Sequence, residues 1–207
     1  MINLLRRSTF LFLLTAALVF LSRVYAFRQN DNKATDITAG ADESERGWLE
    51  TKSVYFTIQY RADVNLKRVV SRINSRGFSV AHNPPSAATL YALNGVEAKM
   101  AYRFDMIFAR VKEILDMYPS NIHIKVKIFK NRRELNSEYC QLAPFGNTCM
   151  SFYIHAYDTI YTSEQDISDS IIAHEMTHAL IDHYFAVTPP EKVAEMLAQN
   201  VDLHLDD

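Results

Sequence analysis

The stretch HEMTHALIDH, residues 174–183, decides how the rest of the sequence is interpreted. Its first two histidines, His174 and His178, are four positions apart, so on a helix both imidazoles leave the same face one turn apart. Ring nitrogens at that spacing can bind one zinc ion at about 2.0–2.1 Å each. Glu175 would reach a water molecule beside the ion rather than the ion itself. The motif therefore predicts a zinc-bearing helix with Glu175 as general base; the alternative is two surface histidines on an amphipathic helix.

A zinc hydrolase needs a third protein ligand and an open fourth position for water. A pattern with a third histidine at position 184 is excluded, because that position is a tyrosine. A cysteine ligand would have to be Cys140 or Cys149. The third candidate is Glu195, seventeen residues after His178, on a second helix that follows a turn. An antiparallel second helix can present this carboxylate to the same ion, and we therefore expect Glu195 to complete the ligand set.

Length and composition limit the class of protein. A chain of 207 residues has room for one domain. Its 48% hydrophobic and 22% charged residues are ordinary for a globular protein and exclude a disordered chain. The formal net charge is −2, and the only charged residues of the first 26 are arginines, so the remainder is more acidic still. We expect no nucleic-acid partner, because such binding requires a basic face.

The first 26 residues are typical of a signal peptide. Arg6 and Arg7 precede an apolar run of 13 residues, 9–21, and the small residue Ala26 ends a possible cleavage site. The run is shorter than the roughly 18 residues that span a bilayer. We expect a periplasmic or secreted protein, with membrane contact only if this segment stays uncleaved as an anchor. Residues 27–47 are polar and aperiodic, as in a flexible tether, and residues 48–207 are the expected folded domain.

The two cysteines are interpreted with that location in mind. Cys140 and Cys149 lie nine positions apart around a Pro-Phe-Gly turn at residues 144–146. In an oxidising compartment this spacing predicts one disulfide that closes a short loop. The competing interpretation is that one of the two thiols is a metal ligand.

Hydrophobic periodicity predicts an α+β fold. A stripe of apolar residues every three or four positions predicts a long helix at 96–117, and strict alternation predicts a half-buried strand at 122–129. The dipeptide Pro189-Pro190 suits the first turn of a last helix. The predicted strands are 53–60, 122–129, 150–154 and 159–162; the predicted helices are 65–73, 96–117, 132–139, one ending near 184 and one from 189 to 203; residues 83–86 are a predicted loop.

The two C-terminal motifs together resemble those of a known family. HEMTHALIDH followed by PPEKVAEMLAQNV resembles the gluzincin metallopeptidases, the thermolysin-like clan, and especially its small exported or membrane-associated members. In that clan HExxHA is followed by a helix with a pattern close to W-x-x-E-G-x-A-E. The alignment puts Glu195 on the ligand glutamate and Gln199 on an acid that orients a ligand histidine. Gln199 departs from the pattern, since an amide accepts a hydrogen bond less strongly than a carboxylate. The match covers about 45 residues, 152–197.

The resemblance implies a zincin-like fold: a small, mainly antiparallel sheet with packed helices and one zinc ion between two C-terminal helices. It also implies hydrolysis of peptide bonds, with a peptide or protein substrate bound as an added strand along residues 150–155. The oxyanion that forms during such a reaction needs a hydrogen-bond donor. The candidates for substrate binding are Tyr153, His155, Tyr157 and Tyr184.

Two other functions stay open at this stage. The glutamine at position 199 favours a protein of the same fold that binds zinc but has lost catalysis and serves as a binding or scaffold protein. A partner-dependent subunit, whose oxyanion donor comes from another chain, is the other alternative. Zinc without turnover would distinguish the first of these, and activity only on mixing would distinguish the second.

Overall fold

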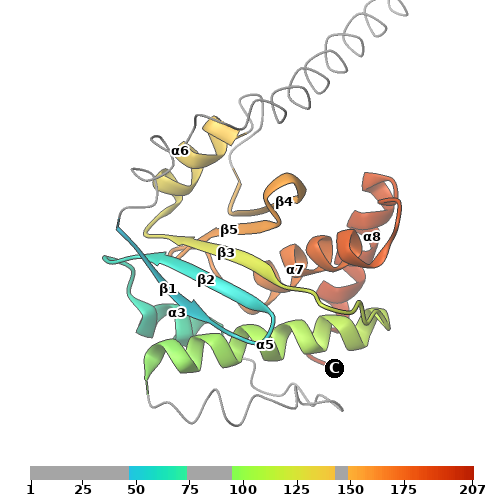
Figure 1. Cartoon of the computed structure of the whole chain (residues 1–207), viewed down its shortest axis with the longest axis horizontal. Helices are drawn as coiled ribbons and strands as arrows, with labels where there is room; N and C mark the ends of the chain where they lie inside the picture. The colour runs from blue at the N-terminus through green and yellow to red at the C-terminus, as the bar shows by residue number, and fades with distance from the viewer. Residues whose placement is uncertain (1–46, 74–94, 143–148) are drawn as a thin grey trace, which may run out of the picture. The chain divides into compact units, whose positions relative to one another are not determined.

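The computed structural model describes residues 47–73, 95–142 and 149–207 (Figure 1). The predicted signal peptide, almost all of the predicted tether and the predicted loop at 83–86 lie outside these residues. Within the described part of the chain, no helix combines the length and apolar character needed to cross a membrane. All the elements below belong to the unit Gly47–Asp207.

A five-stranded sheet forms the centre of this unit, with the order β1-β2-β3-β5-β4. The outer pairs β1–β2 and β4–β5 are antiparallel, whereas β2–β3 and β3–β5 are parallel. The α+β class is confirmed, but the sheet is mixed, so the expected mainly antiparallel sheet was wrong. Helices between β2 and β3 carry the chain back to the same end of the sheet, and such a crossover makes neighbouring strands parallel. The strands are β1 (Trp48–Lys52), β2 (Phe56–Arg61), β3 (Ile124–Phe129), β4 (Ser151–Ile154) and β5 (Thr159–Ser163).

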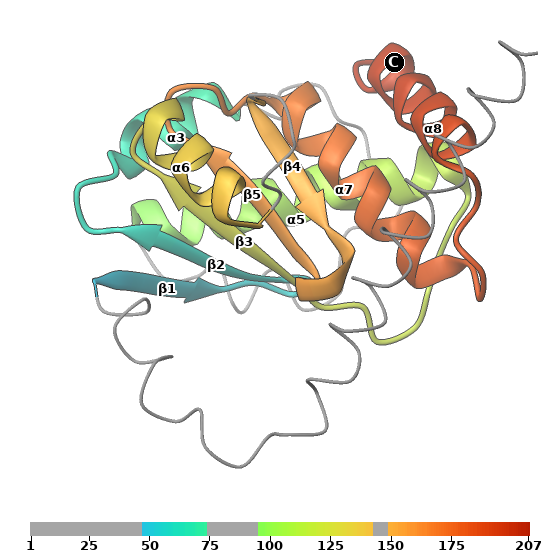
Figure 2. The ribbon, with the colours of Figure 1, turned by 90° about the horizontal axis from the view of Figure 1, so that it is seen from above.

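The helices cover both faces of the sheet. Figure 1 shows the sheet between α5 and α6, and Figure 2 shows α7 between the edge strand β4 and the last helix α8. A single 3₁₀ turn, η2 (His155–Tyr157), joins β4 to β5. The helices are α3 (Leu66–Arg72), α5 (Val96–Leu115), α6 (Arg132–Leu142), α7 (Asp169–Tyr184) and α8 (Glu191–His204).

The main core lies between the sheet and the long helix α5. Alternate residues of β2 are buried, and Phe56 and Ile58 are fully inaccessible. Phe56 packs edge-on against Phe104 and Phe108 of α5, with ring centroids 5.9 and 5.3 Å apart. These contacts combine the period of two in a strand with the helical period of α5, and such aromatic pairs add about 0.5–1.5 kcal/mol each beyond their buried area. A smaller cluster on the other face packs α6 against the sheet through Phe129, Leu135, Phe152 and Tyr161.

Both cysteines have free thiols in the structure, contrary to the predicted disulfide. The predicted helix at 132–139 continues to Leu142, and this longer helix leaves Cys140 exposed on its surface. Cys149 instead packs into the smaller cluster, where its backbone N–H donates to Oδ1 of Asn136 at 3.3 Å. One thiol therefore faces solvent and the other the interior.

Candidate metal centre

The two C-terminal helices have clear local reasons to form and to meet. Ser168 caps α7, since its Oγ accepts a hydrogen bond from the backbone N–H of Ile171 at 3.4 Å. Pro190 directly precedes α8. The face of α8 that packs on α7 and the core contains Ala194 and Ala198, which are 8% and 0% exposed. Such small residues allow the two helix backbones to approach closely.

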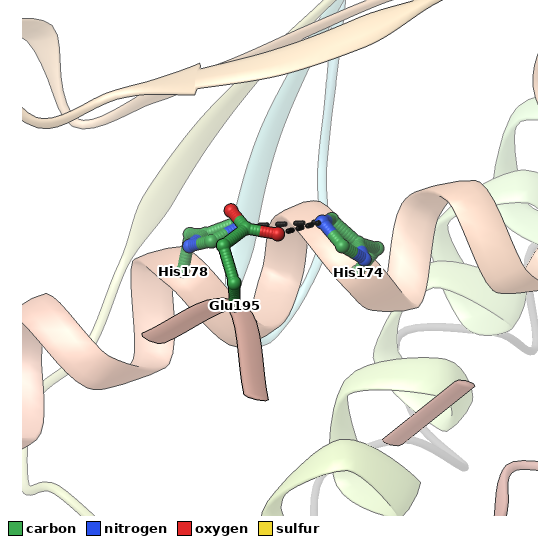
Figure 3. A group of neighbouring side chains, drawn as sticks. All are labelled: His174, His178 and Glu195. Carbon is green, nitrogen blue, oxygen red and sulfur yellow. Dashed lines mark hydrogen bonds and ion pairs between the residues drawn. The ribbon is translucent and has the colours of Figure 1, made fainter. Parts of the chain in front are cut away.

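Three side chains from these helices converge on one point (Figure 3). Nε2 of His178 lies 3.3 Å from Nε2 of His174 and 3.2 Å from Oε1 of Glu195. Nε2 of His174 lies 3.7 Å from Oε2 of Glu195. Among the described residues, these three form the only group of histidine, cysteine and carboxylate side chains whose arrangement could hold a metal ion. The structure thus brings together the ligand set expected from the sequence.

The ring of His174 has a partner that the sequence did not indicate. Its Nδ1 lies 3.1 Å from Oδ2 of Asp202 on α8. Gln199, which was expected to orient one of the histidines, is exposed and makes no hydrogen bond to either of them in the described structure. Asp202 therefore takes the place expected of Gln199. A carboxylate behind a ligand histidine fixes the tautomer and makes the ring a stronger electron donor.

Glu175 lies beside this group but is not part of it. Its side chain is buried, and the residue is only 8% exposed. Burial raises the pKa of Glu175 to about 7; the electrostatic interaction with His174 and a hydrogen bond from the backbone of Tyr153 oppose the rise, while Glu195 adds to it. A carboxyl with a pKa near neutral can both take up and release a proton at that pH.

Two cavities open on Glu175 and His174. The larger has a volume of about 510 Å³ and is also lined by His178, Glu195 and residues 151–153 of β4. The smaller, about 270 Å³, is lined by Asp202 and by the beginning of β4. The three converging side chains thus lie in an open cleft along the edge strand rather than in a closed structural site.

Two of the four predicted substrate-binding residues line a cavity and two do not. Tyr153 and His155 line the larger cavity, whereas Tyr157 and Tyr184 line neither cavity. Burial raises the pKa of Tyr153 far above its usual range, and the negative charge of Asp158 raises it further, so its hydroxyl stays protonated and donates to Oδ1 of Asp158 at 3.0 Å. This hydroxyl is already engaged within the protein.

Cysteine is not part of the cluster. Burial raises the pKa of the Cys149 thiol to about 11, and the nearby charges of Glu175 and Cys140 act in the same direction. A thiol that stays protonated at neutral pH is a poor metal ligand, because the thiolate is the form that binds metals. The chemistry of Cys149 therefore agrees with its absence from the group of His174, His178 and Glu195.

Sequence reasoning missed two carboxylates, Asp202 and Asp182. Oδ2 of Asp182 lies 2.7 Å from Nδ1 of His155. Helix spacing was the only available signal for either: Asp202 is seven positions after Glu195, and Asp182 is four positions after His178. No family model matches the sequence, and no curated protein or solved structure is significantly similar to it.

Proposed function

We propose that the chain is a zinc-dependent hydrolase of peptide bonds, with His174, His178 and Glu195 as the metal ligands. The spacing of the two imidazoles and the carboxylate supports zinc. Ligand atoms at about 2.0–2.2 Å from a tetrahedral ion lie roughly 3.3–3.6 Å from one another. The two Nε2 atoms are 3.3 Å apart, Nε2 of His178 is 3.2 Å from Oε1 of Glu195, and Nε2 of His174 is 3.7 Å from the other carboxylate oxygen, Oε2. Two imidazoles and one carboxylate are also a donor set that leaves a fourth position for water in catalytic zinc sites.

The carboxyl of Glu175 is the proposed general base. A bound zinc ion would supply a Lewis acid that makes water more acidic and polarises a carbonyl group. Glu175 would accept one proton from the attacking water as its oxygen bonds to the carbonyl carbon. The same carboxyl would return that proton to the amide nitrogen as the C–N bond breaks. One water is thereby added across the bond, which yields a carboxylic acid and an amine, and Glu175 ends as it began.

A peptide substrate is supported by the position of the edge strand β4. Among the described residues β4 is an edge strand that pairs with β5 alone, and residues of β4 line both cavities. An extended peptide can add to such an edge through main-chain hydrogen bonds. A peptide bound there would run past Glu175, so the scissile bond would lie next to the proposed base.

Two variants of the full-length protein and a third as a control test the proposal. Glu175→Gln should abolish cleavage of a mixed peptide library, followed by mass spectrometry, while zinc stays at one equivalent by atomic absorption. Glu195→Ala should lose the zinc, whereas Glu191→Ala, one turn earlier on α8 and in the wall of the same cavity but outside the group of three side chains, should keep it. Full cleavage by Glu175→Gln would refute the mechanism. One equivalent of zinc without turnover in the wild-type protein would instead support a non-catalytic zinc-binding protein.

A further inference from the structure

A histidine–aspartate pair lies in the wall of the larger cavity, apart from the metal group. Nδ1 of His155 is 2.7 Å from Oδ2 of Asp182. The Asp182 side chain is only 9% exposed, and its other oxygen accepts a hydrogen bond from Oγ1 of Thr188 at 3.1 Å. The imidazole of His155, in contrast, is 76% exposed and lines the cavity. A fixed carboxylate thus holds one nitrogen of a ring whose other nitrogen has no partner within the described structure.

The turn that carries His155 is held in place by a second, reciprocal pair. Asp158, at the other end of the turn, lies 2.9 Å from Nε2 of His183, the residue after Asp182 on α7. Asp158 has a positive φ of 45°, a conformation that aspartate adopts more readily than most residues. Two histidine–aspartate contacts therefore join the turn to α7: His155 contacts Asp182, and Asp158 contacts His183. Such a double attachment preorganises the His155 ring.

Helix geometry places this pair beside the metal group. His174, His178 and Asp182 follow one another at intervals of four residues, so each side chain leaves α7 one turn after the one before and about 40° round the helix from it. The first two converge on Glu195, and the third holds His155. All of these residues line the larger cavity. A substrate in this cavity can therefore contact the His155 ring as well as the metal group.

We propose that His155, oriented by Asp182, donates a hydrogen bond from Nε2 to the carbonyl oxygen of the substrate as that oxygen gains negative charge. Because Asp182 accepts a hydrogen bond from Nδ1, donation from Nε2 requires the doubly protonated ring. The proton stays on Nε2 throughout, so Glu175 alone transfers protons. This assignment rests on the proposed hydrolase function and supplies its oxyanion donor from within the chain.

The alternative is that the pair only fastens the turn to α7, and the neighbouring pair offers a matched control. His183 and Asp158 join the same two elements, but His183 lines neither cavity, and its Nε2 faces Asp158. Removing His183 loosens the turn without removing a donor from the cleft. A purely structural role predicts similar effects for both histidines, whereas the donor role predicts a much larger effect for His155 than for His183.

The test compares His155→Ala, Asp182→Asn and His183→Ala in the full chain. Removal of one oxyanion donor lowers kcat by about 10²–10³-fold, so His155→Ala should lose about that much with KM changed by less than about threefold. Its affinity for a peptide phosphonate, a tetrahedral oxyanion mimic, should fall in parallel, while affinity for the corresponding product peptide and the zinc content stay unchanged. Asp182→Asn keeps an acceptor but loses the charge and should show a smaller loss of the same kind. His183→Ala loosens the turn but leaves His155 and Asp182 in place, so it should lose much less kcat and phosphonate affinity than His155→Ala and keep the wild-type zinc content and product-peptide affinity.

Unchanged kcat and phosphonate affinity in His155→Ala, with wild-type cleavage intact, would overturn the donor role and leave the hydrolase proposal standing. Equal losses in His155→Ala and His183→Ala would show that the pair only fastens the turn. A zinc-loaded wild-type protein that cleaves no peptide and does not prefer the phosphonate to the product peptide would refute both proposals.

Discussion

Nδ1 of His174 lies 3.1 Å from Oδ2 of Asp202, and Nε2 of the same ring faces His178 and Glu195. A proton on Nδ1, shared with the carboxylate, leaves the lone pair on Nε2 free for a metal ion. Because Glu195 and Asp202 both belong to α8, one helix supplies a proposed ligand and the group that orients another. The geometry of the centre therefore depends on how α8 packs against α7.

The first prediction concerns that orienting carboxylate. Asp202→Ala should weaken zinc binding by about 10- to 100-fold, the usual effect of removing the partner behind a ligand histidine. Gln199→Ala, on the same helix but without a bond to either histidine, should bind zinc as tightly as wild type. Competition with a chromophoric chelator measures both affinities. Equal affinity in Asp202→Ala and wild type would mean that the contact does not support the metal site.

A second prediction concerns Asp105, a carboxylate of α5 that is completely buried. It accepts hydrogen bonds from the hydroxyl of Ser53 at 2.7 Å and the backbone N–H of Val54 at 2.9 Å, between β1 and β2. Asp105→Ala would leave these donors buried and unsatisfied, and should lower the free energy of unfolding by about 2–4 kcal/mol. Asp105→Asn retains one acceptor oxygen and should lose less. Urea unfolding followed by circular dichroism measures the difference; equal losses would show that packing, not hydrogen bonding, matters at this position.

A third prediction follows from two buried carboxylates near the start of α7. Burial by itself would raise the pKa values of Asp166 and Glu164, but hydrogen bonds from Arg132 to Asp166 and from Lys130 to Glu164 outweigh burial and lower both. These groups bind fewer protons in the folded state, so their contribution to stability is complete above their unfolded pKa values of about 4 and is lost as pH falls through the lower folded values.

The urea midpoint should therefore fall steeply below about pH 4. Arg132→Met removes the partner that lies 3.1 Å from Oδ2 of Asp166. The variant should be less stable than wild type at pH 7, and the difference should shrink as pH falls toward 3. A difference that stays constant with pH would mean that Arg132 contributes through packing rather than through the charge of Asp166.

Helices were easier to predict than strand order, for a physical reason. The long helix expected at 96–117 forms at 96–115, because its apolar stripe is a local property of the sequence. The strand expected to begin at Ser53 begins at Phe56, and β1 was not predicted at all. The break between the two strands is held by Asp105, about fifty positions later in the chain. A contact at that separation leaves no pattern in the local sequence.

The site shows the same division between local and distant information. The spacing of His174 and His178 is a property of one helix, and it predicted their convergence correctly. For the group that orients one of the two histidines, the resemblance favoured Gln199, which lies four residues after Glu195 and about 40° round α8 from it. Asp202, seven residues on, lies about 20° round on the other side. Only the packing of α8 on α7 decides which of these directions meets the histidine ring.

The last prediction asks whether the anchoring of α8 controls the metal site. Arg110 of α5 donates from Nη2 to the carbonyl oxygens of His204, at 2.9 Å, and Asp207, at 3.1 Å. A cation at this position satisfies carbonyls that have no partner within the helix and interacts favourably with its C-terminal dipole. Arg110→Ala should lower the free energy of unfolding by about 1–3 kcal/mol. It should also weaken zinc binding, by less than the loss in Asp202→Ala, since Asp202 lies in the freed last turn.

Arg103, a second arginine of α5, offers a control that separates the loss of stability from the loss of zinc affinity. Arg103 donates to the carbonyl oxygens of Val70 and Ile73 at the end of α3, which contributes no residue to the metal group or to either cavity. Arg103→Ala should lose stability to a similar extent yet bind zinc with wild-type affinity. If both variants lost zinc affinity equally, general destabilisation would explain the loss. If only Arg110→Ala lost zinc affinity, the contact between Arg110 and the end of α8 would hold Glu195 and Asp202 against α7. The comparison is direct because both substitutions replace an arginine of α5 with alanine.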